Sequence, residues 1–305
     1  MPNLGFCAKS HFSSSNHATL RCESYYGRAL VALKARIAYF GKEGSNTQQA
    51  AMRMFGGSCD FEGCTSIQKV FSAVEEGKAS HGVVPIENSV EGTVGLTNDL
   101  LYRSNLCITG ESYLKIMHCL IARPGTALEG MRHVISHPQA LGQCSEFLSS
   151  HGLEGIPFAD TASSVSALSR EEYSGYGAIA AREAASIYGM EVLLEDVGDF
   201  RDNYTRFVSI SREPNDAIST AKTKASVVVS VDHKPGSLKE VLEIYHRYGI
   251  NLTKIESRPV KHSPWRYIFF LDSQGTPDDE AAFRELQQKC LEYKFLGRYP
   301  TAFPD

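Results

Sequence analysis

The sequence predicts an α/β protein with a smaller βαββαβ unit at its C-terminal end. Short runs rich in β-branched residues alternate with helical patterns from Arg36 onward, and this alternation is typical of α/β domains with a mainly parallel sheet. After residue 223 the expected order is strand, helix, strand, strand, helix and strand, which is the order of a ferredoxin-like fold. A chain of 305 residues is long enough for about two domains.

The first part of the α/β region shows strand and helix signals in turn. Residues 37–40 predict the first strand, and the loop after it leads to a helix over 47–55, for which Glu43 is expected to supply the cap. Ser66 is expected to cap a second helix, in which apolar residues follow the i, i+3, i+4, i+7 spacing of a buried face. We therefore expect helices packed on a sheet.

The next strand is predicted at 81–84, and Pro85 is expected to end it because proline cannot donate to a central ladder. The loop over 86–92 then follows a strand end, and open α/β sheets bind ligands beyond such ends. An apolar segment over 106–122 is expected to lead into a second α/β unit. Within that unit the patterns predict strands at 134–135 and 177–181 and helices at 138–148 and 161–168.

A linker is expected over 213–223, where polar residues and Pro214 show little periodicity. The βαββαβ unit follows over 224–305. Its first helix is expected to open at Pro235-Gly236-Ser237, and its last at Thr276-Pro277-Asp278-Asp279, where a capping residue precedes a proline and an acid.

Composition favours a globular protein without nucleic-acid or membrane partners. Hydrophobic residues make up 42% and charged residues 22% of the chain, and the formal net charge is -4. This balance gives no positive field that would attract nucleic-acid phosphates or anionic lipids. No apolar stretch reaches the ~20 residues that a membrane helix needs. Eight cysteines without a Cys-x-x-Cys pair indicate reduced thiols, so a cytoplasmic protein is expected.

Residues 1–35 differ from the rest of the chain because serines and arginines are frequent and Glu23 is the only acid. They lack the apolar core of a secretory signal. Two interpretations stay open. The segment is either a disordered extension or a leader similar to an organelle transit peptide, and the second would place the protein in the plastid stroma.

Four short motifs carry a resemblance to a known family. They are Gly82-Val83-Val84-Pro85-Ile86-Glu87-Asn88-Ser89, Ser136-His137-Pro138-Gln139-Ala140-Leu141, Asn203-Tyr204-Thr205-Arg206-Phe207 and Glu256-Ser257-Arg258-Pro259. In this order and spacing they make the chain resemble the prephenate dehydratase family from about Arg36 to the C-terminus.

The resemblance implies a two-lobed catalytic domain over 36–212, similar to periplasmic ligand-binding proteins, with a second lobe over about 112–195. It also implies a phenylalanine-sensing ACT domain over 224–305. A fused chorismate mutase is not expected, because only residues 1–35 precede the first strand and such a helical unit needs roughly 90 residues.

The implied activity is that of a carbon–oxygen lyase that makes phenylpyruvate from prephenate for phenylalanine biosynthesis. Loss of carbon dioxide and hydroxide makes the ring aromatic, and this supplies the electron sink, so neither a metal nor an organic cofactor is expected. The sequence offers no His-x-x-x-His pair or P-loop. Arogenate dehydratase is the nearer alternative. A non-catalytic amino-acid-binding sensor is the alternative from another class.

Thr205 and Arg206 are the predicted catalytic residues. Thr205 resembles the family's key catalytic residue and would donate a hydrogen bond to the leaving hydroxyl. Arg206 would hold a substrate carboxylate as a bidentate fork. Phe207 completes the motif as a candidate substrate neighbour, although its ring is expected on the opposite face, in the core. Without the resemblance, Thr205 and Arg206 would be interpreted as a threonine and an arginine on an ordinary exposed strand.

Further substrate contacts are expected at strand ends and helix starts, where backbone N–H groups favour anions. The candidates are Ser45, Asn88, Ser89, Ser136, Gln139, Thr161 and Ser163. For Asn88 and Ser89 the alternative is turn chemistry, in which the side chain bonds its own backbone. His137 fits a turn or cap better than a general acid, and Glu87 fits a structural role because it would repel a dianionic substrate.

Two segments of the C-terminal unit resemble the family segments that enclose phenylalanine between paired domains. They are Gly236, Ser237 and Leu238, and Glu256, Ser257, Arg258 and Pro259. The resemblance therefore implies a homo-oligomer, a dimer or a tetramer, with L-phenylalanine as allosteric ligand. The alternative is a purely structural dimerisation module.

Overall fold

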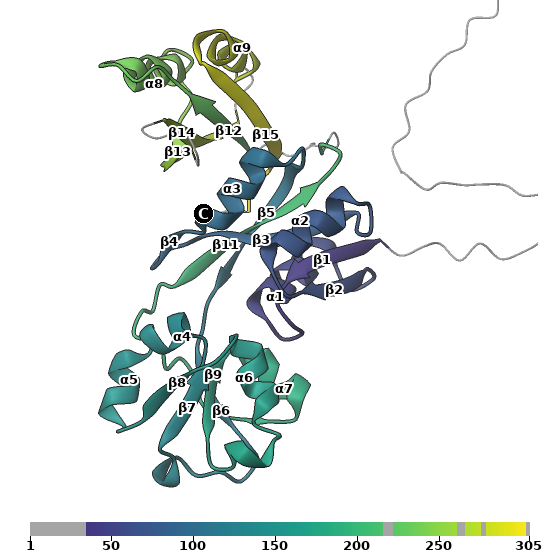
Figure 1. Ribbon diagram of the computed structural model, residues 1–305, viewed down its shortest axis with the longest axis vertical. Helices are drawn as coiled ribbons and strands as arrows, with labels where there is room; N and C mark the ends of the chain where they lie inside the picture. Colours follow the sequence, from purple (N-terminus) through teal and green to yellow (C-terminus); the bar gives the residue numbers. More distant parts are fainter. Residues whose placement is uncertain (1–34, 216–221, 261–265, 276–278, 303–305) are drawn as a thin grey trace, which may run out of the picture. The chain divides into compact units, whose positions relative to one another are not determined.

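The computed structural model describes residues 35–215, 222–260, 266–275 and 279–302 (Figure 1). Spatial clustering divides the chain into Met1–Leu33 and Lys34–Asp305, and the second unit contains all of the described residues. Within these ranges no helix is both long and apolar enough to cross a membrane. The cysteines in these ranges are free thiols at Cys59, Cys64, Cys107, Cys119, Cys144 and Cys290.

The first sheet has the strand order β2-β1-β3-β11-β5, with β4 paired to β3. Its strands in the described residues are β1 (Arg36–Phe40), β2 (Asp60–Cys64), β3 (His81–Asn88), β4 (Gly92–Thr93), β5 (Cys107–Lys115) and β11 (Tyr204–Ser211). β1 is parallel to β2 and β3, whereas β11 is antiparallel to β3 and β5. The prediction of an α/β fold is confirmed, but the sheet is mixed because β11 inserts between β3 and β5.

Three helices cover this sheet, namely α1 (Asn46–Phe55), α2 (Ile67–Glu75) and α3 (Gly95–Arg103). Ser66 caps α2 as predicted, by accepting from the amide of Lys69. Ser45, and not Glu43, caps α1, because its short hydroxyl in extended backbone reaches the amide three residues on. Phe207 faces α1, whereas Val208 faces the other side, with α2.

β3 continues through Pro85 to Asn88, so the prediction that Pro85 ends the strand is wrong. The β1 partners of β3 stop at Val83, and the pairing with β11 skips from Pro85 to Glu87 at a bulge. The missing N–H of proline therefore falls where the ladder is already irregular. The extra residues carry β3 far enough to place Asn88 opposite Thr205.

The second sheet has the order β10-β6-β9-β7-β8. Its elements are β6 (Cys119–Ala122), β7 (His133–Ser136), β8 (Glu154–Pro157), β9 (Gly177–Ala180), β10 (Glu191–Leu194), α4 (Pro138–Gly142), α5 (Ser145–Ser150), α6 (Thr161–Ala167) and α7 (Arg182–Tyr188). The apolar segment 106–122 forms two strands, β5 and β6, in different sheets. The single helix predicted over 138–148 is two short helices, since Cys144 has non-helical backbone between them.

The C-terminal sheet has the order β13-β14-β12-β15, with antiparallel pairs throughout. Its elements are β12 (Thr223–Ser230), α8 (Ser237–Arg247), β13 (Leu252–Pro259), β14 (Tyr267–Gln274), α9 (Asp279–Lys289) and β15 (Glu292–Pro300). This is the predicted βαββαβ order. The start predicted for the last helix at 276–278 lies outside the described residues.

The two faces of the C-terminal sheet have different neighbours. One face packs on α8 and α9 through residues such as Val227 and Leu271. The other face contributes Phe270 and Leu296 to an apolar cluster that also contains Leu101 of α3 and Ile108 of β5. The C-terminal sheet and the first sheet therefore share a continuous core.

Candidate active site

Thr205 and Asn88 form a cross-strand pair between β11 and β3. The side-chain nitrogen of Asn88 donates to Thr205 Oγ1 at 2.9 Å and to Asn203 Oδ1 at 2.7 Å. Because an amide nitrogen can only donate, the Thr205 hydroxyl accepts here and keeps its own hydrogen for another acceptor. Asn88 is buried and Thr205 is partly exposed, so the pair presents a positioned O–H donor.

Asn88 and Ser89 also fix the turn that leads out of β3. Asn88 Oδ1 accepts from the amides of Val90 and Glu91 at 3.0 and 2.9 Å. Ser89 Oγ donates to the carbonyl of Asp202 at 2.9 Å and accepts from the amide of Tyr204, also at 2.9 Å. The turn chemistry considered as an alternative is thus present for Asn88, whereas the Ser89 hydroxyl joins this turn to the start of β11. Ligand contact by either residue stays a prediction.

A chain of amide and imidazole side chains continues from this pair and ends at Glu91. Asn203 Nδ2 donates to Gln143 Oε1 at 2.9 Å, and His118 Nε2 contacts the same oxygen at 2.8 Å. Gln143 Nε2 donates to Glu91 at 3.2 Å. Burial lowers the pKa of His118 although its bond to Gln143 opposes the shift. The imidazole is therefore neutral, with Nε2 as the donor to the amide oxygen.

This amide network was not predicted from the sequence. It joins β3 and β11 of the first sheet to Gln143 after α4 and to His118 just before β6. Of its members, Asn203 belongs to a motif that carries the family resemblance, but it was not proposed as a site residue. Gln143 lies one helical turn after Gln139, so the helical spacing was the signal that could have found it.

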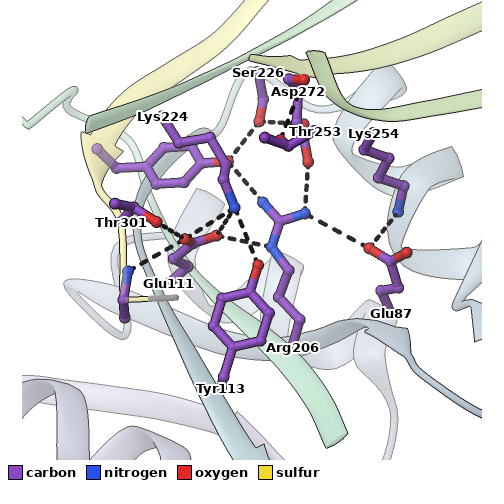
Figure 2. A network of polar contacts seen from close by, with 12 residues as sticks. Glu87, Glu111, Tyr113, Arg206, Lys224, Ser226, Thr253, Lys254, Asp272 and Thr301 are labelled. Atoms are coloured by element: carbon purple, nitrogen blue, oxygen red, sulfur yellow. Dashed lines mark hydrogen bonds and ion pairs between the residues drawn. The ribbon is translucent and has the colours of Figure 1, made fainter. Parts of the chain in front are cut away.

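Arg206 lies on the opposite face of β11 from Thr205, because successive strand residues alternate. Its side chain is 4% exposed. Nε donates to Glu111 at 2.8 Å, Nη1 to Asp272 at 2.5 Å and Nη2 to the Tyr299 hydroxyl at 2.9 Å (Figure 2). The fork that was expected to hold a substrate carboxylate is occupied by protein carboxylates. Alternation along the strand separates the two predicted catalytic side chains.

The charges around Arg206 are balanced. Lys224 Nζ lies 3.0 Å from both oxygens of Glu111. Burial opposes the charge of Arg206, yet Asp272 and its other partners hold its pKa well above the ordinary value. Burial likewise opposes ionisation of Asp272, but the guanidinium lowers the pKa of this carboxyl. Burial, followed by the nearby Arg206, lowers the pKa of Lys224.

Glu87 extends the buried ionic cluster toward β13. Its carboxylate lies 3.3 Å from Lys254 Nζ and 3.7 Å from Arg206 Nη1. The structural role expected for Glu87 is consistent with these contacts. Glu87 is directly opposite Arg206 in the β3–β11 ladder. This pair faces the C-terminal sheet, and it is next along the two strands to the Asn88–Thr205 pair.

Most other candidates use their polar groups within their own element or sheet. Phe207 is 2% exposed and packs with Ile37, Tyr39 and Val83. Ser136 is fully buried and donates to the carbonyl of Ile179 at 2.6 Å. Ser45 serves as the α1 cap. The structure does not bring these three side chains into the hydrogen-bonded set around Thr205.

The helix starts that were expected to bind anions have protein caps. The Asp160 carboxylate accepts from the amide of Ser163 at 2.7 Å and from its hydroxyl at 2.5 Å, so a negative group already occupies the start of α6, beside Thr161. At α4, His137 Nδ1 accepts from the amide of Gln139 at 3.3 Å. This agrees with the interpretation of His137 as a turn or cap residue.

A pocket of ≈ 780 Å³ lies at the start of α8. Ser237, Leu238, Arg266, Tyr267 and Phe269 are among its lining residues. Gly236 has a φ of 92°, which favours glycine. The Ser237 hydroxyl is buried and has no hydrogen-bond partner among the described residues.

The second segment predicted to bind phenylalanine lies elsewhere in the chain's own fold. Glu256, Ser257, Arg258 and Pro259 belong to the edge strand β13 and do not line the pocket at α8. Arg258 Nε instead donates to Asp99 of α3 at 3.0 Å. Within one described chain, the two segments are therefore not brought together.

Comparisons with known proteins identify a family for each part of the chain. Residues 37–215 match the family described as "Prephenate dehydratase", and residues 225–290 match "ACT domain". The chain is 38% identical over 275 residues to a bifunctional chorismate mutase/prephenate dehydratase of Aquifex aeolicus, covering 88% of this chain and 74% of the relative. It is 37% identical over 280 residues to the chloroplastic arogenate dehydratase/prephenate dehydratase 2 of Arabidopsis thaliana, covering 88% and 73%.

Among solved structures, a prephenate dehydratase from Arthrobacter aurescens in complex with L-Phe is similar over most of both chains. The alignment has a TM-score of 0.81 and 32% sequence identity, and it covers 88% of this chain and 90% of that chain.

Proposed function

The chain belongs to the prephenate dehydratase family, with an ACT domain at its C-terminal end, and we propose that it converts prephenate to phenylpyruvate with Thr205 as the hydrogen-bond donor to the leaving oxygen. The observation that carries this proposal is the bond from Asn88 to Thr205 Oγ1 at 2.9 Å. That bond uses the acceptor side of the hydroxyl and leaves its hydrogen available to a substrate.

The reaction needs little covalent help from the protein. The electrons of the breaking bond to the carboxylate move into the ring, hydroxide leaves from the far side of the ring, and the ring becomes aromatic. A threonine hydroxyl is too weak an acid to transfer its proton fully at neutral pH. Its contribution is a preorganised hydrogen bond to the oxygen that gains negative charge, an effect of ~100-fold or more in comparable sites. The donor bond from Asn88 polarises the hydroxyl further.

Arg206 acts indirectly in this proposal. Its guanidinium is engaged by Glu111 and Asp272, and it is therefore assigned to the position of β11 and not to a substrate carboxylate. The remaining substrate contacts are proposed from the resemblance alone, because no hydrogen bond in the described residues links their side chains to Thr205. These are Ser45, Ser89, Ser136, Gln139, Thr161, Ser163 and Phe207.

A second candidate substrate is arogenate, since the Arabidopsis relative carries both activities in its name. The test is kcat/KM of the purified full-length chain on each substrate, with phenylpyruvate and phenylalanine measured as the products. We expect the higher value for prephenate. A preference for arogenate would reassign the enzyme to that substrate. No turnover of either would favour the amino-acid-binding sensor.

Phenylalanine is the proposed regulator, and the pocket at α8 is its proposed site. The start of an 11-residue helix with the unpartnered Ser237 hydroxyl suits the ligand carboxylate. Tyr267 and Phe269 supply an apolar wall. Glu256 to Pro259 would come from a second copy of the chain, as the resemblance implies, which makes the proposed enzyme a dimer or tetramer.

The Arthrobacter relative in complex with L-Phe supports this part of the proposal. Calorimetric titration of the full-length protein with L-phenylalanine, and the same titration of Ser237→Ala, measure the site directly. We expect weaker binding in the variant. Equal affinity would remove the pocket at α8 from the proposal.

A further inference from the structure

The β3–β11 pair has two faces with different connections. Asn88 and Thr205 are paired on one face, and the adjacent residues Glu87 and Arg206 are paired on the other. We propose that Glu87 and Arg206 transmit the ligand state of the ACT domain to Asn88 and Thr205. This inference rests on the proposed function, because it requires a dehydratase that phenylalanine regulates.

Three strands of the ACT sheet hold the Glu87–Arg206 pair. Arg206 bonds to Asp272 on β14 and to Tyr299 on β15, and Glu87 bonds to Lys254 on β13. These contacts come from different positions around the pair (Figure 2). A rearrangement of the ACT sheet therefore cannot leave the pair unaffected.

The hold on the guanidinium is rigid. Ser226 Oγ donates to Asp272 at 2.5 Å and lies 2.6 Å from the Tyr299 hydroxyl, so both ACT partners of Arg206 are themselves fixed. The side chain is nearly fully buried, and ionic hydrogen bonds in such surroundings are strong and sensitive to geometry. Since adjacent Cα atoms are about 3.8 Å apart, a shift of Arg206 is passed directly to the backbone of Thr205.

The input side lies on β13. Two contacts join this strand to β3 and α3, one just before the segment from Glu256 to Pro259 that is proposed to contact phenylalanine and one within that segment. Lys254 pairs with Glu87 at 3.3 Å, and Arg258 pairs with Asp99 of α3 at 3.0 Å. Residues 254, 256 and 258 share one face of the strand. A ligand that moves this strand moves the contacts to Glu87 and α3 with it.

The quantity to measure is the coupling factor, defined as the ratio of kcat/KM without and with saturating L-phenylalanine. Couplings of this kind are about 5- to 150-fold. Two isosteric changes interrupt the connection from its two sides, Glu87→Gln on β3 and Asp272→Asn on β14. The control is Lys289→Gln, because Lys289 forms an exposed ion pair with Glu240 within the same ACT domain at 2.9 Å.

For Glu87→Gln we expect kcat/KM without phenylalanine and the Kd of phenylalanine to stay close to those of the wild-type protein, while the coupling factor falls toward one. Asp272→Asn should lower the coupling factor further. If the Asp272→Asn variant does not fold, the coupling factor of Glu87→Gln alone decides the test. Lys289→Gln should keep the wild-type factor.

An inhibited wild-type enzyme whose coupling factor is unchanged in Glu87→Gln overturns the inference and leaves the proposed function intact. A lower kcat with unchanged coupling also overturns it, because the pair would then serve folding alone. A wild-type enzyme that turns over prephenate but ignores phenylalanine has no ligand state to transmit and also overturns the inference. A wild-type protein that turns over neither prephenate nor arogenate overturns the proposed function, and the inference with it.

Discussion

Two polar networks meet on adjacent residues of β11, and they differ in almost every physical respect. The network that ends at Thr205 consists mainly of amide side chains with a neutral histidine, and its last member is partly exposed. The network around Arg206 consists of ionised groups, and its guanidinium and the Glu111 carboxylate are buried. An amide that donates to a hydroxyl oxygen leaves the hydrogen of that hydroxyl free to donate elsewhere. Buried charged groups, by contrast, must be fully paired.

The difference explains why one strand can serve two purposes. The amide next to Thr205 can orient a catalytic donor without placing a charged group in direct contact with it. An ionic network ties domains together firmly, because each buried charge has a penalty if its partner departs. The two networks touch through the backbone of β11, between Thr205 and Arg206, and through that of β3, between Asn88 and Glu87.

The largest effect is expected from removing the charge at the centre of the ionic network. Arg206→Met should lower the free energy of unfolding by about 3–5 kcal/mol, because Asp272 and Glu111 each lose a buried ion-pair partner. Denaturation with urea, followed by circular dichroism, measures this loss.

The matched control for this change is Arg247→Met. Arg247 also pairs with a carboxylate, Glu285, but its side chain is 52% exposed. Its removal should lower the free energy of unfolding far less, because water and salt weaken an exposed ion pair. Equal losses in the two variants would mean that the buried network is no more important than a surface ion pair.

The next effect belongs to the neutral network. Thr205→Ala should lower kcat by ~100-fold or more with little change in KM, since the lost hydrogen bond forms in the transition state. Thr205→Ser keeps the hydroxyl and should retain most of the activity. Stopped assays of phenylpyruvate formation measure both variants. Near-normal turnover in Thr205→Ala would show that the Asn88 bond positions no catalytic group.

The smallest effect is a pH dependence at His118. Because burial lowers the pKa of the folded-state imidazole, the unfolded chain binds the proton first as the pH falls. Stability is therefore complete above the unfolded pKa of about 6.5 and is lost as the pH falls below it toward the folded value. In His118→Gln, the fall in Tm between about pH 7.5 and pH 5 should be smaller than in the wild-type protein.

His246→Gln is the comparison for that measurement, because His246 is exposed on α8. Its fall in Tm over the same pH interval should match that of the wild-type protein. If both histidine variants behave alike, protonation of His118 makes no specific contribution to acid sensitivity.

Much of the fold follows from local patterns, and the differences have local or long-range causes. The cap that Ser66 provides for α2 and the βαββαβ order of the C-terminal unit were predictable from capping residues and apolar periodicity. α3 was missed because it starts at Gly95 without a side-chain cap. The course of β3 through Pro85 depends on a bulge opposite β11, and pairing between strands so far apart in sequence leaves no local signal.

Sequence motifs identified Thr205 and Asn88 as candidates, but not the arrangement of their side chains, and their roles toward a substrate stay a prediction. The motif that contains Thr205 and Arg206 is contiguous in sequence, but a strand sends the two side chains to opposite faces. Which face meets the C-terminal sheet depends on partners such as Asp272, which lies 66 residues further along the chain. The helical spacing from Gln139 indicated Gln143, but not its partner Asn203, which lies 60 residues away.

Lys294 of β15 shows that the chain completes an early helix very late in its synthesis. Its Nζ bonds to the carbonyls of Leu101 at 2.8 Å and Tyr102 at 2.9 Å and also to that of Ser104, and so satisfies the C-terminal end of α3. The two positions are separated by 193 residues, which a ribosome needs about 10–40 s to add. Until β15 is made, these carbonyls of α3 must bond to water or to another donor.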